Sequence, residues 1–190
     1  SADGKKGSAL KTALWSVIKS HKQRSYDNLW DDFKTTDRRS DGKVWDMYSS
    51  TTNYTFGADQ AGSYKKEGDV YNREHSFPKS WFNKASPMYT DLFHLVPTDG
   101  YVNSQRGNYP FGETNGEEYQ SNGGFSKLGK CTVSGYSGIV FEPNDEYKGD
   151  FARIYFYMAT CYEDKISGWN SDMLAHNKYP AYKTWVVDML

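Results

Sequence analysis

The amino-acid sequence predicts a loop-rich α+β fold, built around a small strand, strand, helix (ββα) unit that packs on helices. Two strand-like runs, 70–73 and 92–96, are followed by a short helical segment at 101–106. A long amphipathic helical pattern begins near residue 150. The segments between these elements are rich in Gly, Ser, Thr, Asn and Asp, which predicts long loops.

The N-terminal part predicts two helices and then a long crossing loop. Ser8 can cap a first helix with one apolar stripe, and we expect that stripe to pack on the core. The stripe consists of Leu10, Leu14, Val17 and Ile18. Residues 25–33 predict a second short helix or turn, and 34–43 a loop. Residues 44–48 predict a strand, and 49–69 a long surface loop, a kind that is often functional.

The ββα unit concentrates polar side chains. The first strand delivers Glu74 and His75 just before Pro78, which cannot continue a hydrogen-bonded ladder, so His75 lies at a strand end. Pro97 to Gly100 stop the second strand, and Thr98 or Asp99 caps the following helix. The first turn of that helix carries Asn103 and can lie against the strand end. An imidazole, a carboxylate and a carboxamide are therefore expected together.

The C-terminal half predicts little regular structure before its helices. Residues 109–130 carry five glycines and read as loop and sheet edge, without a phosphate-binding pattern. Residues 133–141 predict a hairpin-like strand pair or one bulged strand, and Asp150 caps the next helix. The apolar face of that helix contains Phe151, Ile154, Tyr155, Met158, Ala159 and Tyr162. Pro180 opens a last helix whose stripe runs to Leu190, which is expected of a chain truncated at its C-terminus.

Length and composition predict one domain over residues 1–190, because no long polar linker divides the chain. Aromatic residues make up 17% of the sequence and must form much of the core. No hydrophobic segment approaches 18 residues, so none is expected to span a membrane. The net charge is −1, yet residues 1–24 carry six Lys or Arg and one Asp. That segment is either a basic binding surface or a solvated helix face.

Several short motifs occur in a characteristic order. They are Trp45 to Ser49, Arg73-Glu74-His75 with Pro78, Asp91-Leu92, Leu95, Pro97, Gly100, Val102-Asn103, Arg106 and Asn108, then Phe141-Glu142-Pro143, Lys148-Gly149-Asp150, Ala152-Arg153 and Tyr157-Met158. With these residues the chain resembles, over residues 1–190, the endonuclease I family of bacterial extracellular and periplasmic nucleases. That family carries a ββα-metal, or His-Me finger, active site.

The resemblance implies a role for each matching residue. His75 would be the general base that activates water, and its neutral form is available near neutral pH. Glu74 and Asn103 would hold one divalent metal. Their oxygen ligands suit Mg²⁺, with Ca²⁺ or Mn²⁺ as alternatives. Arg106 or Arg73 would clamp the phosphate, since guanidinium binds phosphate oxygens in a bidentate manner.

Other readings of these residues stay open. His94 is the second candidate for the base, although its strand position favours a buried, hydrogen-bonded histidine. Asp91 either orients its loop or pairs with an arginine. Arg153, at the start of a core helix, is either paired structurally or aimed at the active site as a phosphate ligand. Cys131 and Cys161 have no spacing typical of zinc, and a disulfide between them is favoured.

The function expected from the resemblance is hydrolysis of phosphodiester bonds in DNA, with little sequence specificity and 5′-phosphate ends. RNA is the second candidate substrate. A secreted or periplasmic location also follows from the resemblance alone. A rival interpretation is a secreted, aromatic-rich binding module without catalysis, which only the aromatic content and glycine-rich loops favour. The sequence does not give an oligomeric state.

Overall fold

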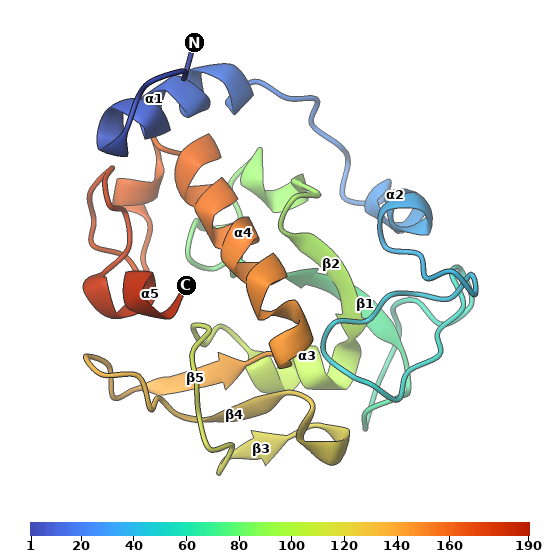
Figure 1. The fold of residues 1–190 in the computed structure, drawn as a ribbon. Coiled ribbons are helices and arrows are strands. Elements are labelled where there is room, and N and C mark those ends of the chain that lie inside the picture. The colour runs from blue at the N-terminus through green and yellow to red at the C-terminus, as the bar shows by residue number, and fades with distance from the viewer.

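The computed structural model describes residues 1–190 and has the predicted α+β organisation. Helix α4 (Asp145–Cys161) crosses the middle of the molecule, between two small antiparallel sheets (Figure 1). The strands are β1 (Tyr71–His75) and β2 (Leu95–Asp99) in one sheet, and β3 (Tyr119–Gln120), β4 (Lys127–Lys130) and β5 (Ile139–Glu142) in the other. No helix is long and apolar enough to cross a membrane.

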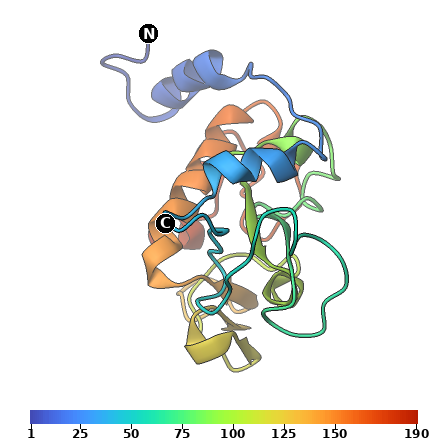
Figure 2. The same cartoon turned by 90° about the vertical axis from the view of Figure 1, so that its right-hand side faces the viewer.

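Four further helices surround this centre. They are α1 (Gly7–Ile18), α2 (Leu29–Thr36), α3 (Gly100–Arg106) and α5 (Thr184–Met189), with 3₁₀ turns η1 (Met88–Thr90), η2 (Asn122–Gly124) and η3 (Ile166–Gly168). Helix α1 lies across one end of α4 and contacts it. An extended linker then carries the chain to α2, which Figure 2 shows in front of the β1–β2 sheet. The long loop that follows α2 leads to β1.

The ββα unit forms as predicted, with one shift. Strands β1 and β2 pair antiparallel, with His75 opposite Leu95 at the end of β1. Strand β2 begins and ends three residues later than expected, so Pro97 lies inside it, opposite Arg73. A strand of a two-stranded sheet has a free edge, where a missing N–H group is tolerated. Asp99 then caps α3, because its carboxylate accepts the backbone N–H of Val102 at 2.8 Å.

The main core is aromatic, as the composition predicts. It contains 26 buried residues between Met47 and Val186, and α4 runs through it. Tyr155 of α4 is fully buried, and its hydroxyl donates to the carbonyl oxygen of Ser76 at 3.0 Å, just after β1. Tyr182 in turn donates to the carbonyl oxygen of Tyr155 at 2.6 Å. Tyrosine can fill this core because each buried hydroxyl finds an acceptor.

Three expectations about local structure are wrong. The apolar stripe of α1 is not buried: Val17 is 70% exposed, and of the stripe only Ile18 packs against the core. Residues 44–48 are largely buried but form an irregular segment, with one isolated bridge at Val44 in place of a strand. Helix α4 begins at Asp145, six residues earlier than expected, because Asn144 and not Asp150 caps it, through the N–H of Glu146. Of the two alternatives for residues 133–141, the structure has a single strand, β5, which pairs with β4.

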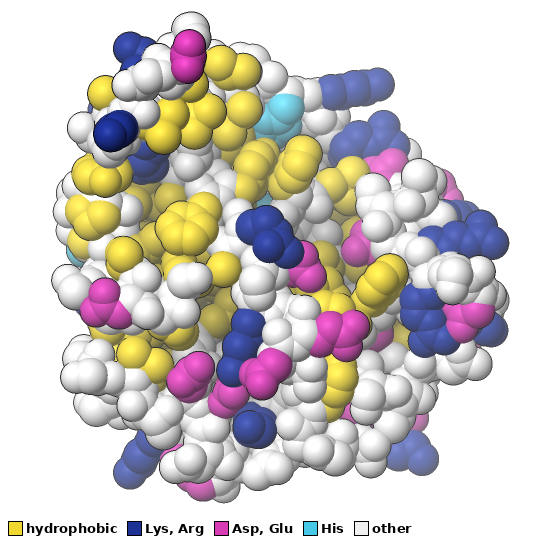
Figure 3. All heavy atoms as spheres, in the orientation of Figure 1, with side chains coloured by type: hydrophobic (Ala, Val, Ile, Leu, Met, Phe, Trp, Pro, Cys, Tyr) yellow, Lys and Arg dark blue, Asp and Glu magenta, His cyan; other side chains and the backbone are white.

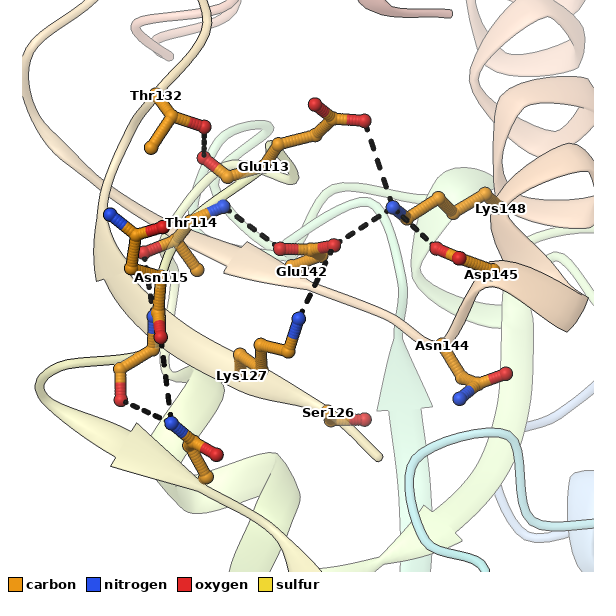
Figure 4. A network of polar contacts seen from close by, with 12 residues as sticks. Glu113, Thr114, Asn115, Ser126, Lys127, Thr132, Glu142, Asn144, Asp145 and Lys148 are labelled. Atoms are coloured by element: carbon orange, nitrogen blue, oxygen red, sulfur yellow. Dashed lines mark hydrogen bonds and ion pairs between the residues drawn. The ribbon is translucent and has the colours of Figure 1, made fainter. Parts of the chain in front are cut away.

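A polar network joins the three-stranded sheet to the first turn of α4 (Figure 4). The carboxylate of Glu142 accepts the backbone N–H of Thr114 and the Lys148 ammonium, both at 2.8 Å. Lys148 also pairs with Asp145 at 2.6 Å. Burial opposes the charge on Lys148, but its hydrogen bonds to Asp145 and Glu142 outweigh burial and raise its pKa. This network fixes the end of α4 relative to β5.

The predicted disulfide is wrong, because Cys131 and Cys161 are both free thiols. Cys131 follows β4, and its sulfur lies 3.9 Å from the carbonyl oxygen of Val133. Cys161 is buried at the end of α4, where its sulfur contacts the Ile18 carbonyl oxygen at 3.6 Å. The two cysteines belong to different parts of the fold, and an even cysteine count could not reveal that.

On one face of the molecule, charged side chains form small groups (Figure 3). On the face shown in Figure 3, hydrophobic side chains gather where α1, α4 and α5 meet, and side chains of both signs are interspersed over the lower half. No field of one sign dominates this face, in keeping with the net charge of −1. Any attraction for a polyanion must therefore be local.

Candidate active site

The candidate site is an open pocket of about 350 Å³ along the free side of β1. Strand β2 covers one edge of β1, while the other edge meets only a single parallel bridge, between Gln60 and Tyr71. Four consecutive residues, 72–75, therefore line the pocket. The other walls come from Tyr26, Trp30, Ala61, Gly62, Pro78, Lys79, Asn103, Gly107 and Asn108.

The two faces of β1 supply different kinds of side chain. Successive side chains of a strand point to opposite faces. Asn72 and Glu74 face helix α3, where they meet Asn103 and Arg106. Arg73 and His75 face the segment around α2, where both contact the ring of Tyr26. The strand thus has carboxylate and amide groups on one face and cationic and imidazole groups on the other.

Glu74 is buried, but only one of its carboxylate oxygens is used. Oε1 accepts the Tyr48 hydroxyl at 2.9 Å and is paired with the Arg106 guanidinium. Oε2 forms no hydrogen bond with the protein, and it is not a buried unpaired atom, so it is open to the pocket. Burial raises the pKa of Glu74, while Arg106 and Tyr48 oppose that rise. The arrangement presents one oriented carboxylate oxygen.

Asn103 presents a second oxygen from the first turns of α3. Its amide nitrogen donates to the Oδ1 atom of Asn72 at 2.6 Å, which fixes the orientation of the amide group. Its own Oδ1 atom accepts no hydrogen bond from the protein. A carboxylate oxygen and an amide oxygen without protein partners form a donor set that suits a hard divalent cation. The sequence prediction for these two residues therefore fits the geometry.

His75 has a free nitrogen on the other side of the strand. Its Nε2 atom lies 3.0 Å from the carbonyl oxygen of Tyr89, which can only accept, so Nε2 carries the hydrogen of the neutral ring. Nδ1 then holds a lone pair and has no protein partner. Burial lowers the pKa of His75 to about 3, and the neighbouring His94 adds to this shift. The ring is therefore neutral at pH 7, and Nδ1 carries an unshared lone pair.

Arg73 is held by aromatic rings at the pocket wall. Its guanidinium carbon lies 3.5 Å from the ring centre of Tyr26 and 4.3 Å from that of Trp30. One of its nitrogens donates to the Tyr26 carbonyl oxygen at 2.7 Å. The ion pair of Arg73 with the fully exposed Asp27 is long, at 3.8 Å, and weak. Other N–H groups of the Arg73 guanidinium therefore have no partner. Arg73 is thus a rigid cation beside His75.

The other two predicted arginines do not reach the pocket. Arg106 is fully buried beneath Glu74, and its guanidinium donates to the carbonyl oxygens of His75, Ser76 and Tyr109. This arginine supports the end of β1 and does not face a ligand. Arg153 lies on an exposed part of α4, pairs with Asp150 and lines a separate hollow. The basic residues of 1–24 do not line the pocket either.

His94 and Asp91 are structural neighbours of the site. His94 is completely buried, and its Nε2 atom lies 2.6 Å from the Met88 carbonyl oxygen, which confirms the interpretation of a buried, hydrogen-bonded histidine. Asp91 does not pair with an arginine. Its carboxylate accepts the hydroxyls of Tyr157 and Tyr162 at 2.8 and 2.5 Å. Neither His94 nor Asp91 lines the pocket.

Comparison with known proteins decides the family. A family model described as Endonuclease I matches residues 6–190. The chain belongs to the endonuclease I family. The resemblance drawn from the sequence motifs is thereby confirmed.

Individual relatives of this endonuclease I member carry two kinds of name. Extracellular ribonucleases from Bacillus amyloliquefaciens and Bacillus subtilis (strain 168) are each 38% identical over 164 residues, 85% of this chain and 52% of theirs. An Endonuclease-1 from Buchnera aphidicola subsp. Baizongia pistaciae (strain Bp) is 34% identical over 79 residues, 41% of this chain and 30% of the relative. The chain spans about half the length of the Bacillus relatives. No solved structure matches it.

Sequence reasoning missed the aromatic wall and one amide partner of the site. Tyr26 and Trp30 lie more than 40 residues before Arg73, and no spacing links them to it. Asn72 did leave a signal. It stands two residues before Glu74, so a strand places both on one face, and its carboxamide could have been expected beside Asn103. Tyr48 was noticed only as part of a motif, although its hydroxyl donates to Glu74.

Proposed function

We propose that the protein is a metal-dependent endonuclease that hydrolyses phosphodiester bonds with little sequence specificity. One observation carries the proposal: Glu74, Asn103 and His75 line one pocket, and Glu74 Oε2, Asn103 Oδ1 and His75 Nδ1 have no protein partner. Two hard oxygen ligands beside one neutral imidazole are what hydrolysis of a phosphodiester by activated water requires. Membership of the endonuclease I family supports the same chemistry.

Glu74 and Asn103 would hold the metal, and their chemistry fits Mg²⁺, with Ca²⁺ or Mn²⁺ as alternatives. When bound, such an ion neutralises negative charge on the phosphate and on the leaving oxygen. Asn72 keeps the amide oxygen of Asn103 turned toward the pocket, through the 2.6 Å hydrogen bond. Tyr48 and Arg106 hold the Glu74 carboxylate in place and leave Oε2 free.

His75 would take a proton from the attacking water at Nδ1, while Nε2 stays bonded to the Tyr89 carbonyl oxygen. That bond keeps the ring in one tautomer and stabilises the imidazolium that forms. Arg73 would contact the nonbridging oxygens of the phosphate, since its guanidinium is already oriented by Tyr26 and Trp30. In-line attack by water that expels the 3′ oxygen would leave 5′-phosphate ends.

Water as the nucleophile makes the sugar unimportant for the reaction. We propose DNA as the substrate, because the reaction does not need a ribose 2′-hydroxyl. RNA is the second candidate, and the two similar proteins named extracellular ribonuclease favour it. A mechanism that used the ribose 2′-hydroxyl could not cleave DNA at all. The names of those relatives also support a secreted or periplasmic location.

The test is cleavage of plasmid DNA and of a long RNA by the purified chain, with Mg²⁺ and with EDTA. We expect both to be cut with Mg²⁺, neither with EDTA, and the products to carry 5′-phosphates that a 5′-phosphatase removes. His75→Ala should be inactive, and Arg153→Ala, far from the pocket, should match the wild type. Cleavage of RNA alone with cyclic phosphate ends would overturn the mechanism. Binding without cleavage would favour the rival binding module.

A further inference from the structure

Outside the pocket, the fold brings together three side chains that are typical zinc ligands. His21 belongs to the linker between α1 and α2, Asp91 follows η1, and Cys161 ends α4. One ligand atom from each lies within 4.8 Å of the other two. These residues are 70 positions apart from one to the next, so no sequence spacing could have indicated a site. None of them lines the candidate active site.

The carboxylate of this group has no cationic partner. The Asp91 side chain is only 2% exposed, yet no lysine or arginine pairs with it, and the nearest basic group is His21 Nε2 at 3.8 Å. Its Oδ2 atom accepts the hydroxyls of Tyr157 and Tyr162, and its Oδ1 atom accepts the backbone N–H of Phe93. A buried charge is costly unless it is paired, and hydroxyl donors neutralise none of it. A bound cation would neutralise this charge.

The ligand types and their exposure indicate which cation. Cys161 and Asp91 are buried, but the His21 side chain is 24% exposed, so the group opens to solvent on one side. We propose that His21, Asp91 and Cys161 bind Zn²⁺, with water as the fourth ligand. Thiolate and imidazole select zinc over magnesium or calcium. The thiol proton of Cys161 leaves to solvent when the ion binds.

The geometry requires a small closure. Zinc bonds of about 2.0 Å to nitrogen and 2.3 Å to sulfur place tetrahedral ligands about 3.5 Å apart. The sulfur of Cys161 is already 3.9 Å from His21 Nδ1, on one side of the ring, while Asp91 lies near the other nitrogen. A rotation of the imidazole with a small inward shift would bring one nitrogen to both partners. The irregular linker that carries His21 permits such a movement.

Zinc at this position would tie the N-terminal linker to the core. His21 stands five residues before Tyr26, whose ring covers Arg73 and stacks near His75. Tyr157 and Tyr162 would act as orienting residues for the Asp91 ligand, in the way that metal-bound carboxylates are usually hydrogen-bonded themselves. The site is separate from the nuclease pocket, so it does not depend on the proposed function.

The test uses Co²⁺ as a spectroscopic probe, in the Cys131→Ser variant, where Cys161 is the only thiol. We expect a cobalt–thiolate charge-transfer band in the near ultraviolet that saturates at one Co²⁺ per chain and disappears when Zn²⁺ is added. Excess Mg²⁺ should leave the band unchanged. Absence of the band at saturating Co²⁺ would overturn the proposal.

Single substitutions then identify the ligands. Cys161→Ser should abolish the band, and His21→Ala should weaken Zn²⁺ binding at least about 10-fold, while Lys22→Ala, on the same linker, should leave it unchanged. Tyr162→Phe should weaken binding about 10-fold by removing a donor to Asp91. His21 is partly exposed, so its variant remains informative if Cys161→Ser fails to fold. A His21→Ala protein that binds Zn²⁺ like the wild type would refute the site.

Discussion

His75 and Glu74 are adjacent in the chain, and their side chains lie on opposite faces of β1. Mutation can distinguish the proposed role of His75 as general base from that of Glu74 as metal ligand. His75→Ala should lower the cleavage rate by roughly 10² to 10⁴-fold while Mg²⁺ and DNA binding stay nearly normal, and added imidazole should restore part of the rate. Glu74→Ala and Asn103→Ala should instead require more Mg²⁺. The measurement is the cleavage rate against Mg²⁺ concentration.

The matched control is His94→Ala, which removes the neighbouring histidine. His94 is completely buried and does not line the pocket, so this variant should lose stability more than rate. If His94→Ala is folded but inactive and His75→Ala retains full activity, then His75 is not the base.

The lowered pKa of His75 also has a consequence for stability. Its pKa is about 3 in the folded protein and near 6.5 in the unfolded chain, so only the unfolded chain takes up a proton between these values. Stability from this group is complete above pH 6.5 and declines as the pH falls toward 3. Urea unfolding in EDTA should show that the free energy of unfolding falls less between pH 7.5 and pH 4.5 in His75→Gln than in the wild type, by at most about 3 kcal/mol. Equal losses in both proteins would contradict this.

Between elements, the buried pair of Arg106 and Glu74 joins α3 to β1. Arg106→Met leaves the Glu74 carboxylate buried without its cation, and we expect the free energy of unfolding to fall by about 3 to 5 kcal/mol. The double variant Glu74→Gln with Arg106→Met should recover much of this loss, because no charge is then left unpaired. Urea denaturation of the two variants measures the difference. No recovery in the double variant would mean that the contacts of Arg106 with backbone carbonyls dominate.

The elements also show how far sequence patterns can be followed. The ββα unit, the Asp99 cap and the buried face of α4 were predictable, because turn residues and apolar spacing act locally. The stripe of α1 looked equally clear, yet Leu14 and Val17 remain exposed, since an amphipathic pattern does not say whether a partner surface exists. The start of α4 was misplaced because Asn144 and Asp150 are both good caps.

At the site, the sequence predicted which residues of one continuous segment meet, but it did not predict contacts between segments far apart in the chain. Glu74, His75 and Asn103 come from one continuous unit, so their meeting followed from its topology. The aromatic wall and the separate group of His21, Asp91 and Cys161 depend on how segments far apart in the chain pack together. The role expected for Arg106 changed for the same reason: only the fold shows that it lies behind Glu74.

At the scale of the whole molecule, one aromatic core runs from Met47 to Val186, which predicts that the chain unfolds as a single cooperative unit. Scanning calorimetry should give equal calorimetric and van't Hoff enthalpies. The measurement is made in the presence of EDTA, so that metal binding does not add a transition. Two resolved transitions would show that residues 1–190 contain more than one folding unit.

The tyrosine-rich interior gives the protein a built-in optical probe of its integrity. The sequence contains 16 tyrosines, and burial raises the pKa of several that are almost fully enclosed, among them Tyr48, Tyr155, Tyr162 and Tyr182. In an alkaline titration the exposed phenols should ionise at once near pH 10. The enclosed ones can form phenolate only when the chain opens, so their ultraviolet absorbance should rise later, at the speed of alkaline unfolding.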